Sequence, residues 1–371
     1  MRLRVAIVFA LCFFLSVAWS AEELSTRLSD AAFWKLVTDF SEPDGRFPSD
    51  NFVSNELAIQ RVLPNLVKGR QAGGAYLGVG PEQNFTYIVA LRPKIAFIID
   101  IRRQNMIQHL MYKSLIEMST DRADFLSHLF SRRRPPNLGK DSSVTDLFDA
   151  YHDAEMDGNL YEDTVAAVEN HLTKDHGFEL STDDQNVITK IMQAFAIGGT
   201  SLGYPGPQRS NSPRILPTYE ELMVDTDDEG RPQSYLATED NFVTLQQFER
   251  NNLLVPIVGD FAGPSAIRSV GEYLRTHNTT VIALYTSNVE QYLFMNDVWK
   301  SFYKNVATLP LDERSVFIRP LINTGPGGYA ASPLFRPGFH WDTLLFPIRN
   351  LITAFDEGMI ENYYDVIAVR N

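Results

Sequence analysis

The sequence predicts an α/β protein built on a doubly wound, mostly parallel sheet, with a helical insertion between the second and third core strands. The main observation is that short, unbroken apolar runs, typical of buried parallel strands, alternate with segments of helix length. The alternation stops at about residue 119 and resumes at about residue 251. A length of 371 residues with 44% apolar residues is sufficient for one large core that carries an insertion.

The first twenty residues have the pattern of a signal peptide. A basic start, Met1 to Arg4, precedes an uncharged apolar run from Val5 to Trp19, and the small residue Ser20 ends the segment. The run is shorter than the roughly 20 residues that a membrane-spanning helix needs. We therefore expect cleavage after Ser20, export to the periplasm or the cell exterior, and no stable membrane anchor afterwards; a retained anchor is the alternative.

Charge and cysteine content restrict the partners. The only cysteine, Cys12, lies in the predicted signal peptide, whose removal leaves 31 basic against 46 acidic residues, a net charge of −15. Such an acidic chain repels phosphate backbones, so we expect no nucleic acid partner. The histidines lack a paired metal-binding spacing, and His171 and His176 are interpreted as cations near a helix end, so no metal is expected.

The elements follow in order along the chain. An N-terminal helical segment (21–72) contains a Pro/Gly loop at Ser41–Ser49. The first part of the core (73–118) has strands Ala75–Gly78 and Ile95–Ile99 with helices Glu82–Leu91 and Arg102–Glu117. The insertion, interpreted as a cap (119–250), has helices Asp146–Asp153, Tyr161–Leu172 and Asp183–Ala196. The second part of the core (251–371) has strands Leu253–Val258, Thr280–Tyr285, Ser315–Arg319 and Tyr363–Val369, and helices Pro264–Arg275, Val289–Leu309 and Trp341–Phe355.

Polar and glycine residues follow the predicted strands at their carboxyl ends, where doubly wound sheets bind ligands. They are Gly78 and Gly80 after the first strand, Asp100 after the second, Asp260 after the third, and Ser287 and Asn288 after the fourth. An acid at the position of Asp100 can accept hydrogen bonds from a ribose diol. The alternatives are a helix cap or an ion pair with Arg102 or Arg103 for Asp100, and helix caps for Asp260 and Ser287.

Two resemblances rest on these segments. GGAYLGVGPEQN and IAFIIDIRRQN resemble the glycine motif and acidic second strand of class I S-adenosylmethionine-dependent methyltransferases, and VIALYTSNVEQYL and SVFIR are similar to their fourth and fifth strands. PEQNFTYI, VGDFAGP and SNVEQYLF more closely resemble a family of uncharacterised bacterial proteins with this core, from about Phe33 to Ile318. The resemblance implies a Rossmann-like, methyltransferase-like sheet.

The resemblance also implies roles for individual residues. Gly78 and Gly80 would flank the methionine end of S-adenosylmethionine, Asp100 would hold the ribose and Asp260 would lie by the adenine. Ser287 and Asn288 would face the methyl donor and acceptor. The sequence departs from the pattern at Pro81-Glu82, where a further small residue is usual, and Glu82 would bring negative charge near the cofactor carboxylate.

Methyl transfer needs alignment of donor and acceptor and at most a general base. The candidate bases are Glu82, Glu290 and His340. Two hypotheses follow. The first is a methyltransferase-like protein that uses S-adenosylmethionine on an unknown small molecule, which the strand-end residues favour. The second is an exported, non-enzymatic protein that keeps the fold and binds another ligand or partner, which the predicted compartment favours.

Overall fold

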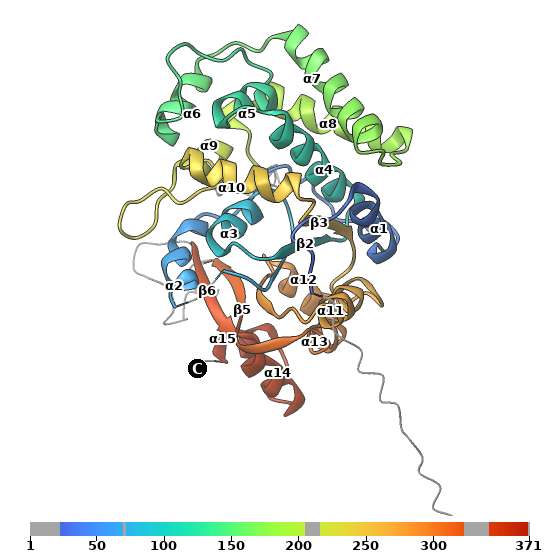
Figure 1. Cartoon of the computed structure of the whole chain (residues 1–371). Helices are drawn as coiled ribbons and strands as arrows, with labels where there is room; N and C mark the ends of the chain where they lie inside the picture. Colours follow the sequence, from blue (N-terminus) through green and yellow to red (C-terminus); the bar gives the residue numbers. More distant parts are fainter. Residues whose placement is uncertain (1–22, 70–71, 205–215, 323–340, 370–371) are drawn as a thin grey trace, which may run out of the picture.

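A six-stranded, mostly parallel sheet lies at the centre of the α/β structure (Figure 1). The computed structural model describes residues 23–69, 72–204, 216–322 and 341–369. The strand order is β3-β2-β1-β4-β5-β6, the order of a Rossmann-like doubly wound sheet. The strands are β1 (Ala75–Gly78), β2 (Ile95–Asp100), β3 (Leu254–Val258), β4 (Val281–Tyr285), β5 (Leu311–Ile322) and β6 (Trp341–Pro347).

The first five strands are parallel and the sixth is antiparallel to β5. The central strand β1 pairs with β2 on one side, where Leu77 is opposite Phe97, and with β4 on the other, where Leu77 is opposite Leu284. Every residue of β1, β2 and β3 is buried, as the unbroken apolar runs of the sequence predicted. The order of the strands along the chain reverses between β1 and β4.

Helices cover both faces of the sheet. On one face lie α3 (Gln83–Leu91), α4 (Arg103–Met118) and α10 (Glu239–Arg250), and α4 packs on β2 and β3. On the other lie α1 (Asp30–Phe40), α11 (Ala266–Thr276), α13 (Trp299–Val306) and α14 (Ile348–Asp356). Phe40 of α1 and Tyr273 of α11 both pack on Phe97 of β2, with ring centroids 6.4 and 6.0 Å away.

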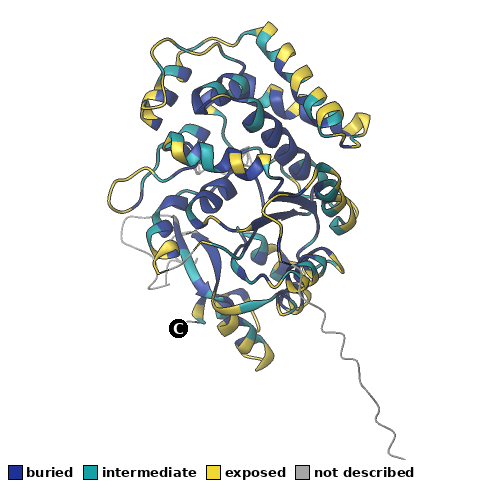
Figure 2. Ribbon diagram, viewed as in Figure 1, coloured by how far each residue is buried: buried dark blue, intermediate teal, exposed yellow. Residues whose placement is uncertain are grey.

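The region predicted to be a helical insertion (119–250) is mostly helical. Besides α10 it contains α5 (Arg122–Phe130), α6 (Val144–His152), α7 (Gly158–Asn170), the π-helical turn η2 (His171–Asp175), α8 (Thr182–Gly198), the 3-10 turn η3 (Gly199–Ser201) and α9 (Tyr219–Val224). Aromatic side chains join this region to the sheet layer: the ring centroid of Tyr235 lies 5.2 Å from that of Phe85 in α3, and the ring centroid of Phe195 in α8 lies 6.0 Å from that of Tyr112 in α4. The exposed residues concentrate on the outer surfaces of α7, α8 and α14 (Figure 2).

Two predictions in the last part of the chain were wrong, and a third was right except for a break in the helix. The predicted helix Trp341–Phe355 is the strand β6 followed by α14, because Pro347 ends the pairing with β5 and precedes the first turn of the helix. The predicted strand Tyr363–Val369 is the helix α15 (Tyr363–Ala368), which begins at a capping box of Asn362 and Asp365. The predicted helix Val289–Leu309 is two helices, α12 (Val289–Met295) and α13, separated at Asp297, which has a φ of +55°.

The N-terminal segment after α1 crosses the carboxyl edge of the sheet. The backbone N–H of Glu42 donates to the carbonyl of Val258 at the end of β3, and that of Gly45 donates to Ile101 after β2, each at 2.8 Å. A Cβ at Gly45 would lie 2.3 Å from Cγ1 of Ile101, so this close crossing requires glycine. The chain continues through the 3-10 turn η1 (Ile59–Val62) and α2 (Leu63–Val67) into β1.

In the part of the chain that the structure describes, no helix is both long and apolar enough to span a bilayer. The predicted signal peptide (1–20), with Cys12, lies outside the described residues, and so does the candidate base His340.

Candidate functional site

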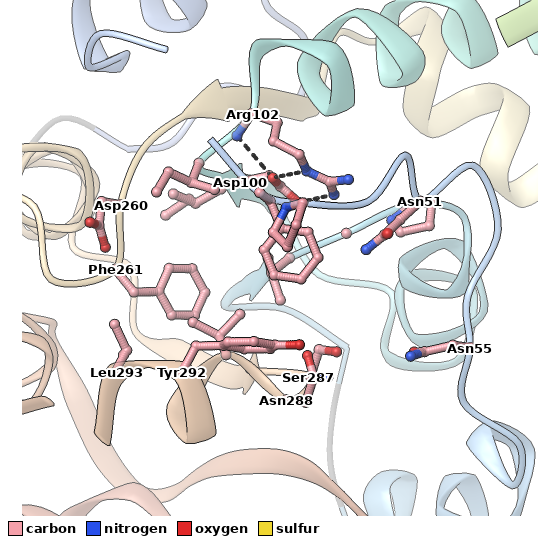
Figure 3. Close-up of a pocket in the computed structure, with 18 of the residues that line it drawn as sticks. Asn51, Asn55, Asp100, Arg102, Asp260, Phe261, Ser287, Asn288, Tyr292 and Leu293 are labelled. Carbon is pink, nitrogen blue, oxygen red and sulfur yellow. Dashed lines mark hydrogen bonds and ion pairs between the residues drawn. The ribbon is translucent and has the colours of Figure 1, made fainter. Parts of the chain in front are cut away.

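A cavity of about 300 Å³ lies at the carboxyl ends of the central strands, where the strand order reverses. Its walls come from the ends of β1, β2, β3 and β4, from α12, and from residues 46–55 of the segment that crosses the sheet edge (Figure 3). Its volume is at the lower end of the range of about 300–1,000 Å³ for small-molecule sites. A doubly wound sheet places its ligand in this position.

Five of the eight predicted site residues that the structure describes line the cavity: Gly80, Asp100, Asp260, Ser287 and Asn288. They come from four different strand ends, which the parallel order of the sheet brings to one edge. Gly80 has a φ of +80°, a conformation that favours glycine. Its carbonyl accepts hydrogen bonds from Asn84 Nδ2 at 3.1 Å and His109 Nε2 at 2.9 Å, so the turn is held rigidly.

Asp100 forms a bidentate ion pair with Arg102 beside the cavity (Figure 3). Arg102 Nε donates to Oδ1 at 3.0 Å and Nη2 donates to Oδ2 at 2.9 Å, while the backbone N–H of Arg102 also donates to Oδ1. The remaining guanidinium nitrogen, Nη1, donates to the carbonyl of Ser49 at 3.0 Å. The alternative that Asp100 pairs with Arg102 is therefore confirmed, and the aspartate borders the cavity as part of a neutral pair.

Asp260 and the first turn of α11 are held by Glu42 of the N-terminal segment. Oδ1 of Asp260 accepts from the backbone N–H of Ala262 at 2.9 Å, which makes a local turn. Glu42 Oε2 accepts from the backbone N–H of Asp260 at 3.0 Å, and Oε1 accepts from those of Ser265 and Ala266 at 2.8 Å. The backbone N–H groups of Ser265 and Ala266 at the start of α11 thus have Glu42 as their hydrogen-bond acceptor.

Gly78 and Glu82 are buried next to the cavity but do not line it. A Cβ at Gly78 would lie 2.0 Å from Oδ1 of Asn84, so this glycine provides space for α3 to pack on β1. Glu82 Oε1 accepts from the backbone N–H of Ser54 at 3.1 Å, and its Oε2 has no hydrogen-bond partner among the described residues. Burial raises the pKa of Glu82 to about 7, so the carboxyl holds its proton more readily than an exposed one.

Glu290, in the first turn of α12, is buried in an ion pair and also does not line the cavity. Arg319 donates to both of its oxygens through Nε and Nη2. Tyr303 donates its hydroxyl to Oε1 at 2.9 Å and Thr286 donates to Oε2 at 3.2 Å. With both oxygens bonded by an arginine and two hydroxyls, Glu290 has the partners of a structural carboxylate.

The sequence analysis missed Glu56, a buried carboxyl group behind Ser287. Glu56 accepts hydrogen bonds from the hydroxyls of Ser287 and Tyr285, and Ser287 reaches it from a left-handed conformation with a φ of +47°. Burial raises the pKa of Glu56 to about 7, against the lowering effect of these two hydrogen bonds. A carboxyl group in that range exchanges protons at neutral pH, and Ser287 connects it to the cavity.

The sequence analysis also missed other residues of the cavity lining, namely two side chains with unpaired hydrogen-bond acceptors and a group of aromatic rings. Asn51 Oδ1 and Gln83 Oε1 are buried without a partner among the described residues, and both side chains line the cavity. The rings of Phe47 and Tyr292 meet edge to face on the same lining, with their centroids 5.2 Å apart, and Phe261 also lines the cavity (Figure 3). A ligand with hydrogen-bond donors and a flat ring would satisfy both groups. Loop polarity around Asn51 was the only signal in the sequence for this wall.

A family model matches residues 51–343, which include most of the cavity wall, from Asn51 to Val298. It is described as a domain of unknown function, DUF7790. The chain belongs to this family. Comparison with curated proteins gives no match. The prediction of an uncharacterised family is therefore confirmed at that level, and DUF7790 carries no description of an activity that would bear on the methyltransferase resemblance.

Proposed function

We propose that this DUF7790 protein is methyltransferase-like and binds S-adenosylmethionine in the cavity, with an unknown small molecule as acceptor. The observation that carries the proposal is the position of the cavity: it lies where the strand order reverses, and Gly80, Asp100, Asp260 and Ser287 meet there from four strand ends. Rossmann-like sheets bind nucleoside-containing ligands at this point.

The residues present fit such a ligand in three respects. The unpaired acceptors Asn51 Oδ1 and Gln83 Oε1 match its amino and hydroxyl donors. The aromatic wall of Phe47 and Tyr292 suits an adenine ring or a sulfonium cation. Oδ2 of Asp100 accepts one hydrogen bond from Arg102 and keeps acceptor capacity for a diol hydroxyl.

S-Adenosylmethionine would supply an electrophilic methyl group, and the protein would have to align the acceptor with it. Ser287 is placed to hold an acceptor hydroxyl or amine, and Glu56 behind it is placed to receive a proton through the serine hydroxyl. Glu56 and the two bases that the sequence analysis named, Glu82 and Glu290, all lie behind the cavity lining. Of these three carboxyl groups, only Glu56 accepts a hydrogen bond from a side-chain hydroxyl that lines the cavity, that of Ser287, so we assign the proton-accepting role to Glu56.

The second candidate function is an exported, non-enzymatic protein that binds another ligand or partner. The bidentate pairing of Asp100 with Arg102 favours it, because a carboxylate reserved for ribose needs no such partner. The predicted export route favours it also, and we retain export through a signal peptide as part of the proposal.

Isothermal titration calorimetry with S-adenosylmethionine, S-adenosylhomocysteine and adenosine tests the proposal. We expect binding of the first two at micromolar concentrations, and at least a tenfold loss in Gln83→Ala, whose side chain lines the cavity. Asp163→Asn, a substitution on the exposed side of α7, is the control and should bind as the wild type does. No heat with any of the three compounds at high micromolar concentration would refute the proposal and leave the second candidate. Equal loss in both variants would refute the assignment of the cavity.

A further inference from the structure

Glu117, His171 and His176 converge at the opposite end of α4 from the cavity. Arg103 begins α4 next to the cavity wall, and Glu117 lies fourteen residues further along the helix, about 20 Å away. His171 opens the π-helical turn η2 and His176 follows it. The cluster is thus a separate group of side chains that the proposed function does not use.

Each of the three residues offers one ligand atom to a common point. Glu117 Oε2 lies 3.0 Å from Nε2 of His171 and 2.7 Å from Nε2 of His176, and all three atoms lie within 4.8 Å of one another. Ligand atoms on a tetrahedral zinc ion, with bonds of about 2.0–2.1 Å, are about 3.3 Å apart. The two oxygen–nitrogen distances would therefore have to lengthen by only about 0.3–0.6 Å to admit an ion.

The outer nitrogens of both histidines have carboxylate partners. His171 Nδ1 lies 3.0 Å from Asp175 Oδ2, and His176 Nδ1 lies 2.8 Å from Asp30 Oδ1. Asp30 is itself held by Asn252, whose Nδ2 donates to Oδ1 at 2.9 Å. Metal-binding histidines nearly always donate their second N–H to a carboxylate or carbonyl, which orients the ring and selects the tautomer with Nε2 free for the metal.

The local charge also suits a divalent cation. Glu117, Asp30 and Asp175 carry three negative charges, and Lys113, whose Nζ lies 2.6 Å from Glu117 Oε1, contributes one positive charge. With both imidazoles neutral, these groups sum to −2, which one divalent ion would balance. The competing arrangement is two protonated histidines, which would balance the same charge without a metal.

We propose that Glu117, His171 and His176 bind a divalent transition metal, with Zn²⁺ the best fit. Two histidines and one carboxylate are a zinc-binding set that leaves a fourth position for water. The side chains of Glu117, His176 and His171 are 6%, 13% and 21% exposed, so solvent can reach that position. The ion would join α4 to η2 and, through Asp30, to α1.

Zinc titration of the chelator-treated full-length protein at pH 7.5 tests the site. We expect one Zn²⁺ per chain, a rise in melting temperature with zinc, and visible absorption bands of tetrahedral Co²⁺ when cobalt replaces zinc. His176→Ala should weaken zinc binding at least 100-fold and abolish the cobalt bands. His152→Ala removes a half-exposed histidine that also faces a carboxylate, Glu220, at 3.4 Å, and as the matched control it should bind normally.

A second variant and two refuting outcomes complete the test of the zinc site. If His176→Ala does not fold, Asp30→Asn, which keeps the ligands but changes the outer partner of His176, should still weaken zinc binding about 10- to 100-fold. The absence of zinc binding by the wild type at 100-fold molar excess would overturn the proposal in favour of protonated histidines. Binding that His152→Ala weakens as much as His176→Ala would overturn it in favour of scattered surface histidines.

Discussion

The buried pair of Glu290 and Arg319 gives the sharpest test of what a predicted site residue does. The side chains are 1% and 0% exposed, and the guanidinium donates to both carboxylate oxygens. Glu290→Ala would leave the Arg319 charge buried and without its carboxylate, with Tyr303 also losing its acceptor. We predict a large loss of stability with no direct loss of a cavity contact.

The size of this stability loss follows from the burial and hydrogen bonding of the ion pair. Removing one partner of a fully buried, hydrogen-bonded ion pair costs about 3–5 kcal/mol. With an unfolding entropy of about 2.1 cal/mol/K per residue, that loss lowers the melting temperature of a chain of this length by about 4–6 °C. The exposed pair of Glu313 and Arg349, with side chains 84% and 50% exposed, is the matched control. Glu313→Ala should change the unfolding free energy by about 0.5 kcal/mol or less.

Urea unfolding followed by circular dichroism would measure both variants. The double variant Glu290→Leu with Arg319→Met should recover a large part of the loss, because it removes the unpaired charge together with its partner. A Glu290→Ala protein as stable as the wild type would refute the reasoning. A stable Glu290→Ala protein with weakened ligand binding would instead restore the catalytic role that the sequence analysis gave this residue.

Three further predictions concern single side chains. Because the pKa of Glu82 is raised to about 7, the folded state holds a proton that the unfolded state releases above about pH 4.5. The contribution of Glu82 to the unfolding free energy should therefore fall by roughly 3 kcal/mol between pH 4.5 and 7, in addition to a fall from Glu56. Glu82→Gln should remove its share of this pH slope in urea titrations, and an unchanged slope would contradict the shift. Glu42→Ala should cost about 1–2 kcal/mol and speed hydrogen exchange at the Ala266 amide, which a merely superficial Glu42 would leave unchanged. Phe85→Ala should cost about 3–5 kcal/mol by thermal unfolding, since its ring meets three buried rings; a loss below 1 kcal/mol would show that the cluster collapses around the gap.

The central sheet could be predicted from the sequence because its strands are locally distinctive. Ile95–Ile99 and Leu253–Val258 are unbroken apolar runs next to turn residues, and both are strands with bounds shifted by a residue at most. The C-terminal errors have a different cause. Trp341–Pro347 has no strong local pattern, and it is a strand because the long β5 offers it an edge to pair with.

The sequence predicted residues of the candidate site only where they come directly at or after the end of a strand. Asp100 and Ser287 lie at strand ends, so their meeting follows from a parallel sheet. Glu56 and Asn51 lie in a segment whose path across the sheet edge depends on long-range contacts, and nothing local marks them. The same limit applies to the metal site that we propose at His171 and His176, where the sequence analysis expected no metal: the third group, Glu117, lies 54 residues from His171.

The central position of β1 has a consequence for the order of folding. Its two neighbours pair with Ala75 through Ile95, which is 20 residues away, and Val281, which is 206 residues away. Closing a loop ten times longer costs about 2 kcal/mol more in chain entropy. The β1–α3–β2 unit can therefore form early, whereas both of its outer strand edges stay open until β3 and β4 have been synthesised. A ribosome-bound chain that ends inside the helical insertion would expose two apolar strand edges, and such intermediates are prone to aggregate.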